Sequence, residues 1–291
     1  MSISVKDFGT PELLIQCEAE VGEGPVWDYS RDVLCWVDLT QGDIYEKDFS
    51  SGAVSVSNIG MMVGAIAPRL NKEGFAVACE DGFGFWNGEQ LDIVDESLSD
   101  SSLRMNDAKC DAKGRLWAGS NHKEFVPGLG KLHKWDSNLK SSIEASNLIL
   151  PNGIGWSPDN KTMYLADSFA QKVYSAPYDL DEGDVGVFTE FISTSSGLPD
   201  GLAVDMEGCI WLAIWGESVV NRYDSKGNLI WVIPMPVSQP SSCAIGREGK
   251  IYLTSARSGI SAQQLKHQPL AGSVFILETD IPGVPIMPFA G

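Results

Sequence analysis

The chain has 291 residues, of which 43% are hydrophobic and 21% charged, and its formal net charge is −18. An acidic field of this size repels nucleic acids and anionic membranes, and no run of Lys or Arg offsets it locally. We therefore expect no nucleic-acid partner and no membrane partner.

Features of export and membrane insertion are missing from the sequence. The opening residues have neither a basic stretch nor an apolar stretch typical of a secretory signal, and no segment approaches 18 uninterrupted apolar residues. The six cysteines are scattered without a C-x-x-C pair, mostly inside apolar runs, so we expect buried free thiols. These observations predict a cytoplasmic protein.

Short runs rich in Val, Ile, Trp and Tyr, bounded by Gly, Pro, Asn and Asp, recur along the chain and predict β-strands. Six of them share a pattern of polar turn followed by an aromatic-containing strand. The residues just before the six turns are Trp27, Leu70, Cys110, Trp156, Val204 and Ile245, with spacings of 43, 40, 46, 48 and 41 residues. This is the period of a four-stranded propeller blade.

We therefore predict an all-β fold, a six-bladed β-propeller of four-stranded antiparallel blades, as a single domain over residues 1–291. Closing such a ring requires the two ends of the chain to meet. We expect the segments Leu13–Cys17 and Ser273–Leu277 to share one blade.

The repeat also predicts a ring of side chains at the mouth of the central channel. Four places before each aligned residue lie Glu23, Ile66, Asn106, Asn152, Asp200 and Ser241. Five of the six side chains carry oxygen, which suits a hard divalent cation such as Ca²⁺, Mg²⁺ or Mn²⁺, with Zn²⁺ and Fe(II) as alternatives. Asn-Gly, Asp-Gly and Glu-Gly are also ordinary turn dipeptides, but turn chemistry alone would not place them in one ring.

Candidates for acid–base chemistry are few. The chain has three histidines, His122, His133 and His267, and no G-x-S-x-G motif that would indicate a serine hydrolase. We expect His133 and His267 to be surface or loop residues. A catalytic base would then be a carboxylate beside the metal.

Five motifs together point to a family: GEGPVWD (22–28), RMNDAKCDAKGRLWAGS (104–120), PNGIGWSPDNKTMYLADS (151–168), PDGLAVDMEGCIWLA (199–213) and PSSCAIGREGKIYLTSAR (240–257). Over essentially its whole length the chain resembles the family of senescence marker protein (regucalcin), gluconolactonase and luciferin-regenerating enzyme. The closing segment resembles the bacterial sugar-lactonase branch.

The resemblance implies one divalent metal held by Glu23, Asn152 and Asp200, with Asp200 as the general base that activates water. It further implies substrate contacts from Arg104, Asn106 and Glu124. The implied reaction is metal-dependent hydrolysis of a small sugar lactone to the aldonic acid.

One segment departs from the family pattern. After Gly119 many relatives have a short acidic stretch, whereas this chain reads SNHKEF. One interpretation is that His122 and Lys123, with Arg104, recognise an anionic group on the lactone such as a carboxylate or sulfonate. The alternative is a loop pointing to solvent.

Three other functions compete with lactone hydrolysis: a divalent-metal-binding or calcium-regulating propeller without significant catalysis, a promiscuous metal-dependent esterase, and a protein-interaction propeller. The intact Arg104–Asn106 pair favours small-molecule chemistry over metal buffering. A polar ring is not typical of a protein-interaction face, and no obligatory protein partner is evident from the sequence.

Overall fold

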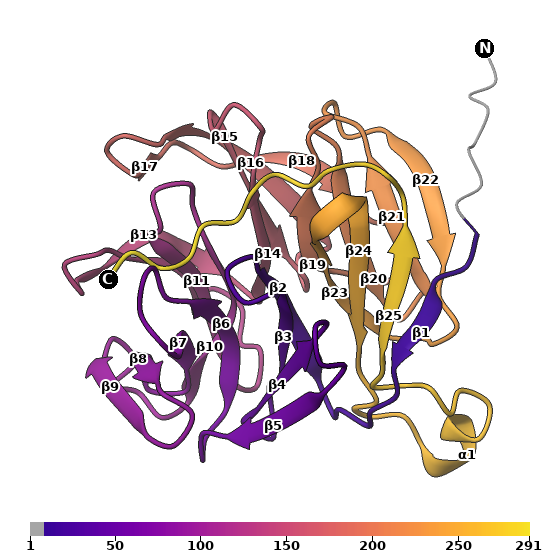
Figure 1. The fold of residues 1–291 in the computed structure, drawn as a ribbon. Helices are drawn as coiled ribbons and strands as arrows, with labels where there is room; N and C mark the ends of the chain where they lie inside the picture. Colours follow the sequence, from indigo (N-terminus) through magenta and orange to yellow (C-terminus); the bar gives the residue numbers. More distant parts are fainter. Residues whose placement is uncertain (1–8) are drawn as a thin grey trace.

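A computed structural model describes residues 9–291, and its strands form six antiparallel sheets arranged around a common centre (Figure 1). The all-β prediction and the prediction of six four-stranded blades are both confirmed. A single 3-10 turn (Arg247–Gly249) and one helix, α1 (Ala262–Leu265), are the helical elements within the described residues.

The blades follow one another along the chain. The first blade contains β2 (Gly22–Asp28), β3 (Val33–Asp38), β4 (Asp43–Asp48) and β5 (Val54–Asn58). The second contains β6 (Val63–Pro68), β7 (Phe75–Cys79), β8 (Gly82–Trp86) and β9 (Leu91–Asp95). The third contains β10 (Leu103–Cys110), β11 (Leu116–His122), β12 (Gly130–Trp135) and β13 (Ser141–Leu148).

The fourth blade contains β14 (Pro151–Trp156), β15 (Thr162–Asp167), β16 (Lys172–Asp179), β17 (Asp184–Val185) and β18 (Thr189–Ser193). The fifth contains β19 (Leu198–Val204), β20 (Ile210–Trp215), β21 (Val219–Tyr223) and β22 (Leu229–Pro234). The sixth contains β23 (Pro240–Ile245), β24 (Lys250–Ser255), β25 (Val274–Glu278) and β1 (Glu12–Ile15).

The ring closes as the sequence predicts, because strands from the two ends of the chain share the sixth blade. Strand β1 pairs antiparallel with β25, with Leu13 opposite Phe275 (Figure 1). This pairing leaves no blade with a missing outer strand.

Burial falls from the inside of each blade to its outside. Every residue of β2, β6, β14 and β23 is buried, whereas the outer strand β5 is almost entirely exposed. The second strand of each blade is covered on both faces, and β3, β7 and β20 are accordingly nearly continuous apolar runs. Five of the six free cysteines are buried in these layers, and Cys17 is half-buried, which confirms the predicted role as small hydrophobes.

The recurring turn places a carboxylate under each of two buried indoles. Trp117 donates its indole N–H to Asp111, and Trp211 donates to Asp205, each six residues along the chain. The same carboxylates accept backbone N–H groups of their own turns. The Asp of the repeat therefore ties the turn to the blade core.

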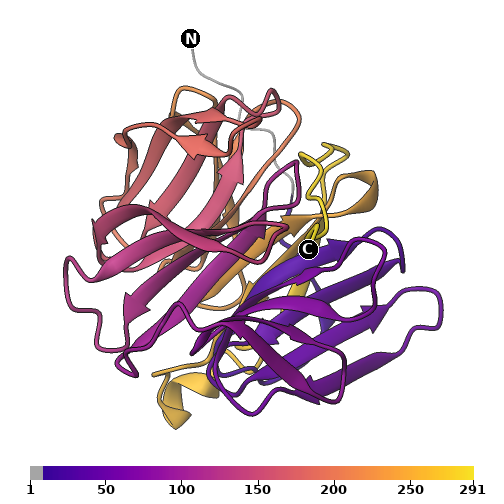
Figure 2. The same cartoon turned by 90° about the vertical axis from the view of Figure 1, so that its left-hand side faces the viewer.

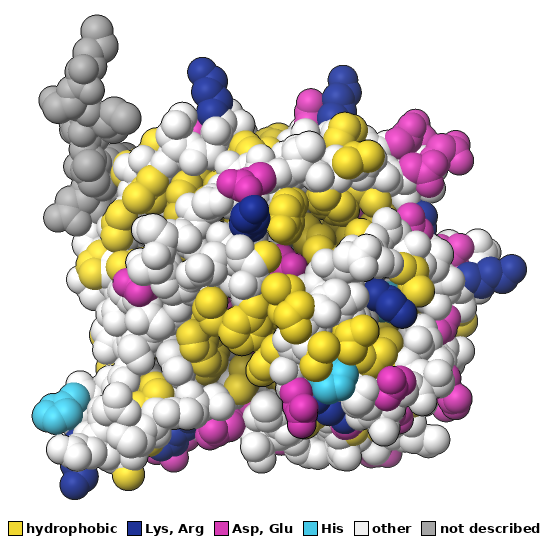
Figure 3. Space-filling model, turned by 180° about the vertical axis from the view of Figure 1, so that it is seen from behind, with side chains coloured by type: hydrophobic (Ala, Val, Ile, Leu, Met, Phe, Trp, Pro, Cys, Tyr) yellow, Lys and Arg dark blue, Asp and Glu magenta, His cyan; other side chains and the backbone are white. Residues whose placement is uncertain are grey.

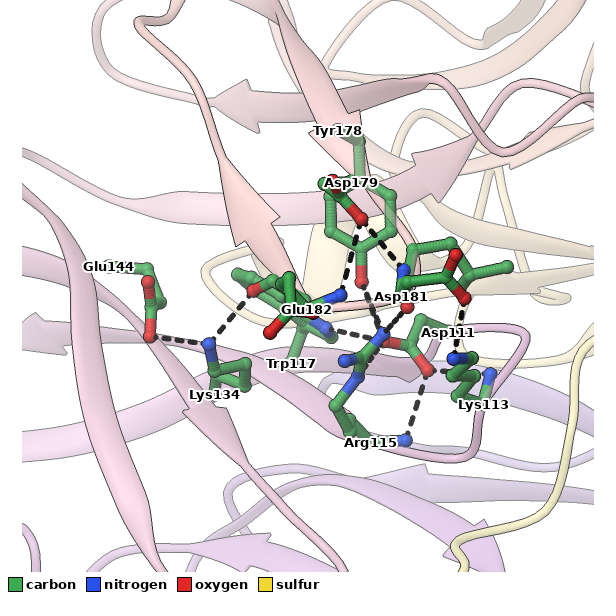
Figure 4. Close-up of polar contacts among 12 residues, drawn as sticks. Asp111, Lys113, Arg115, Trp117, Lys134, Glu144, Tyr178, Asp179, Asp181 and Glu182 are labelled. Carbon is green, nitrogen blue, oxygen red and sulfur yellow. Dashed lines mark hydrogen bonds and ion pairs between the residues drawn. The ribbon is translucent and has the colours of Figure 1, made fainter.

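The fourth blade departs from the prediction by one short extra strand, because β16 is long enough to pair with both β17 and β18. The hairpin between β16 and β17 lies against the third blade (Figure 4). Tyr178 donates to Asp111 at 2.6 Å, and Lys113 pairs with Asp181 at 2.7 Å. The insertion thus fastens two blades together.

The C-terminal segment crosses the face of the molecule opposite the mouth formed by the starts of the inner strands. Its backbone bonds to three blades, through Val204, Pro68 and Gly114. Phe289 is fully buried and stacks on Trp135, with ring centroids 4.4 Å apart. Figure 2 shows the segment in yellow between the earlier and later blades.

Within the described residues, none of the helices has the length and apolar character needed to cross a bilayer.

Candidate metal and active site

The ring predicted from the repeat lies on the six innermost strands, and each of these strands is interrupted there. In all six blades the pairing of the first and second strands shifts register at or directly after the ring position, for example between Pro151 and Ile154. A bulge bends the strand and changes the direction of the side chain. The PNG, PDG and GEGP motifs are therefore bulge sequences that aim their polar residues at the channel.

One member of the predicted ring was wrong. The register of the second blade makes Gly64, and not Ile66, equivalent to Asn152, because the last paired residue of β6 is Pro68, opposite Phe75, as Trp156 is opposite Met163 in β14. A Cβ atom at Gly64 would lie 2.0 Å from the backbone oxygen of Asn106. The second blade therefore contributes no side chain to the ring.

A cavity of about 380 Å³ opens above the ring. Its lining includes Glu23, Asn152 and Asp200 together with Arg104 and Asn106, so the structure brings the three predicted metal ligands together with the predicted Arg–Asn pair, five residues in all. All five are at most 9% exposed. Ser241 does not line this cavity, since its hydroxyl donates to the backbone oxygen of Gly22 and to Thr254.

Asn152 joins two walls of the site through its side-chain amide. Its Nδ2 donates to Asp200 and, at 3.1 Å, to Ser168. The other end of the amide, Oδ1, is buried and has no hydrogen-bond partner. A buried acceptor without a hydrogen-bond partner costs folding free energy, so a donor or a cation bound to this oxygen would stabilise the site.

The charged forms of the two ring carboxylates, Glu23 and Asp200, are disfavoured by burial and by mutual repulsion. Burial raises the pKa of Glu23, and the charge of Asp107 raises it further. Burial likewise raises the pKa of Asp200 well above its ordinary value, followed by repulsion from Glu23 and Asp107. A divalent cation would remove this repulsion and would satisfy Asn152 Oδ1, so the donor set fits a hard metal ion.

Arg104 and Asn106 form a connected pair in the cavity floor. One guanidinium nitrogen of Arg104 donates to Asn106 Oδ1 at 2.7 Å, and Asn106 Nδ2 donates to the backbone oxygen of Pro151 at 3.1 Å. Burial lowers the pKa of Arg104 to about 10, and the nearby Glu23 and Asp200 oppose that shift. The guanidinium therefore remains charged at neutral pH and faces the ring.

The loop that departs from the family pattern contributes less than the sequence suggests. Lys123 lines the cavity, but its ammonium pairs with Glu80 and donates to the backbone oxygen of Ser101 at 2.7 Å. His122 and Glu124 are not part of the cavity lining, and His122 Nδ1 accepts the backbone N–H of Glu124 at 3.1 Å. The structure does not bring these two residues to the ring.

Two polar residues of the site were missed by sequence reasoning. Ser168 accepts the amide of Asn152 and donates to the backbone oxygen of Pro199 at 2.7 Å, so it fixes the orientation of the amide. Asp107 is a third buried carboxylate whose Oδ2 has no partner. Both lie inside motifs already recognised, at the end of LADS and in R-x-N-D, where only their position in space reveals a role.

His133 corrects an expectation, because it is 2% exposed and lies on β12 rather than on the surface. Its Nε2 is 2.8 Å from the hydroxyl of Ser120, which is itself fully buried. Burial lowers the pKa of His133 to about 4. The pair resembles part of a hydrolytic dyad, but it is sealed from the cavity. His267 is exposed, as expected.

A second group of possible metal ligands consists of Asp205, Glu207 and Cys209. Its central carboxylate is already saturated. Asp205 accepts two bonds from the guanidinium of Arg222 at 2.6 and 2.9 Å, besides the indole and two backbone N–H groups. Arg222 occupies the position of the counter-ion, so this cluster is structural.

Comparisons with known proteins identify relatives in sequence and in structure. Residues 21–257 match the family model described as "SMP-30/Gluconolactonase/LRE-like region". A 6-deoxy-6-sulfogluconolactonase from Pseudomonas putida is 31% identical, over 97% of this chain and 99% of its own length. Regucalcin from Gallus gallus is 30% identical, over 93% of this chain and 95% of its own length.

Among solved structures, a calcium-binding regucalcin from Agrobacterium tumefaciens superposes with a TM-score of 0.91. It is 26% identical and covers 97% of this chain and 98% of its own. The matched family segment contains all six bulged inner strands. The chain belongs to the SMP-30/gluconolactonase/LRE-like family.

Proposed function

We propose that this protein hydrolyses a sugar lactone to the corresponding aldonic acid with one divalent metal ion. The observation that carries the proposal is the unpartnered Asn152 Oδ1, on a residue that lines the same cavity as two buried, mutually repelling carboxylates. The names of the relatives, which include a lactonase, support the reaction class.

Glu23, Asn152 and Asp200 would hold the metal, and their oxygens favour Ca²⁺, Mg²⁺ or Mn²⁺, with Zn²⁺ and Fe(II) as weaker candidates. When bound, such an ion supplies a Lewis acid that polarises the lactone carbonyl. Arg104 and Asn106 would bind the hydroxyls of the ring and fix its orientation.

Asp200 would act as general base. It accepts one proton of the attacking water, whose oxygen forms a bond to the carbonyl carbon. The bond between that carbon and the ring oxygen then breaks, and the ring oxygen takes up the proton. The products are a carboxylate and a hydroxyl on one open chain, with release of one proton at neutral pH.

Recognition of an anionic substituent has less support in the structure than the sequence suggests. Lys123 is already paired with Glu80, and His122 lies outside the cavity lining, which leaves Arg104 as the cation of the cavity without a carboxylate partner. The anionic alternative then rests on Arg104 and on the name of the sulfogluconolactonase relative. Comparing kcat/KM on glucono-δ-lactone and on its 6-sulfo analogue decides between a neutral and an anionic substrate.

A metal-binding protein without significant catalysis is the second candidate, favoured by the calcium-binding relative with the same fold. Against it stands Arg104, because a buried guanidinium aimed at a cation site weakens cation binding and serves better to bind a substrate.

The free cysteines also fit the reducing cytoplasm that the sequence predicts.

The test is a lactone panel followed with a pH indicator, after chelation and after each metal is added back. We expect hydrolysis to be lost on chelation and restored by at least one divalent ion. Asn152→Ala and Asp200→Asn should each lower kcat/KM at least about a hundredfold. Glu207→Gln, at the exposed carboxylate of the structural cluster, serves as a matched acidic control.

Two outcomes would contradict the proposal in different ways. Hydrolysis that survives chelation and both substitutions would remove the metal and Asp200 from the reaction. Tight metal binding without turnover of any lactone or simple ester would instead leave the metal-binding function.

A further inference from the structure

The cavity changes character from its floor to its rim. The floor is polar and buried, as described above. The rim is apolar, with side chains from five blades, and all of them but Leu39 are more exposed than the floor. They are Leu39, Met62, Phe125, Phe169, Leu198 and Trp215. Figure 3 shows hydrophobic side chains gathered around the hollowed middle of this face.

Two phenylalanines form the most prominent part of this rim. Phe125 follows β11 and Phe169 follows β15, and their rings lie 4.9 Å apart across the boundary between two blades. They are 38% and 42% exposed. Phe125 has a φ of 56°, which is the left-handed region that aromatic residues rarely adopt. The fold thus holds a pair of exposed rings at the mouth at some cost.

Polar side chains beside these apolar residues in the sequence are engaged by the protein. Thr40, next to Leu39, donates to Asp38 at 3.2 Å. Lys123 is paired with Glu80. A hydroxyl or a charge on the outer part of a ligand would therefore lose water and gain few hydrogen bonds.

We propose that the preferred lactone carries an apolar substituent on the side of the ring away from the carbonyl, and that Phe125 and Phe169 bind it. This inference rests on the proposed lactonase function, because the floor fixes which end of the ligand points inward. The carbonyl and ring hydroxyls meet the polar floor, and the substituent covers the exposed rings. Phe125 and Phe169 are then specificity residues.

A homologous series of γ-lactones, from γ-butyrolactone to lactones with two-, four- and six-carbon side chains, measures the effect directly. Each fully buried methylene contributes about 0.8 kcal/mol, close to fourfold in an equilibrium or rate constant. Because the rim is partly open, we expect kcat/KM to rise about twofold per methylene until the chain outgrows the rings. Glucono-δ-lactone is measured in parallel.

Phe169→Ala should flatten the series, so that kcat/KM changes less than about 1.5-fold per methylene, and should leave glucono-δ-lactone within about threefold of wild type. The matched control is Tyr29→Ala, which removes an aromatic ring of similar exposure (44%) at the far end of β2. This control should keep the wild-type slope. Unfolding curves of both variants confirm that they are folded.

The possible failures are distinguishable. If glucono-δ-lactone is hydrolysed but the wild-type series is flat, or if Phe169→Ala keeps the full slope, the apolar subsite is wrong and the lactonase function stands. If metal-loaded protein hydrolyses no lactone of either kind, the proposed function fails and the subsite fails with it.

Discussion

Two aspartates lie near the opposite ends of β19, and their environments differ. Asp200, at its start, lies among buried carboxylates and is repelled by Glu23 and Asp107. Asp205, just after its end, is fully buried too, yet it accepts bonds from Arg222, from Trp211 and from its own turn. One carboxylate has its counter-charge within the protein, and the other does not.

The comparison shows why a cluster of acidic residues alone does not identify a metal site. Around Asp205 the cation is the side chain of Arg222, held from two strands away in the same blade. Around Asp200, Arg104 is the nearest guanidinium, and its hydrogen bonds go to Met105 and Asn106 rather than to a carboxylate. A divalent ion would supply the positive counter-charge that Asp200 lacks.

The largest expected loss of stability comes from substituting Asp205, the carboxylate that is paired with Arg222. Asp205→Asn leaves Arg222 buried without its main partner and should destabilise the fold by about 3 to 5 kcal/mol. The control is Glu207→Gln, which removes the exposed second partner of Arg222 and should cost less than about 1 kcal/mol. Urea unfolding measures both. Equal, small losses would mean that Arg222 is not the counter-ion of Asp205.

His133 is a third buried ionisable group to compare with Asp200 and Asp205. Burial keeps its imidazole neutral at pH 7. Its pKa is about 4 in the folded protein, below the ordinary value of 6.5. The unfolded chain therefore binds a proton first as the pH falls, so stability is present above pH 6.5 and declines from there to about pH 4. The loss amounts to about 3 kcal/mol at most.

The measurement is the urea midpoint of wild type and His133→Gln between pH 7 and pH 4.5. The difference between the two should shrink as the pH falls, because only wild type loses the contribution of a neutral histidine. A difference that stays constant over this range would show that His133 titrates normally.

The smallest expected change in stability comes from substituting Asp200, and its sign distinguishes Asp200 from Asp205. In metal-free protein, Asp200→Asn removes an uncompensated buried charge and keeps the hydrogen-bonding shape, so stability should rise by about 1 kcal/mol. Thermal unfolding in the presence of a chelator measures this change. A destabilisation as large as that of Asp205→Asn would mean that both aspartates are structural.

Much of the architecture was predictable because the blade repeats. The period fixed six units, and the turn residues placed Glu23, Asn152 and Asp200 at one position of the repeat. Ile66 was misplaced because Leu70 lies two residues beyond the last paired residue of β6, Pro68, and the turn sequence does not show where strand pairing ends.

Other features depend on contacts between segments far apart in the sequence. Nothing near Lys123 in the sequence indicates that Glu80, 43 residues earlier, takes its charge. The burial of His133 depends on packing against Phe83 of the preceding blade. The apolar rim comes from the ends of strands in five blades, so no single motif contains it.

The central claim is that Glu23, Asn152 and Asp200 hold a divalent ion. Isothermal titration of chelator-treated protein with Ca²⁺, Mg²⁺ and Mn²⁺ tests it most directly, with wild type, Asn152→Ala and Glu207→Gln compared in parallel. We predict one site per chain in wild type and in Glu207→Gln, and affinity at least about tenfold weaker in Asn152→Ala. Binding that is unchanged by Asn152→Ala, or lost in Glu207→Gln alone, would contradict the account.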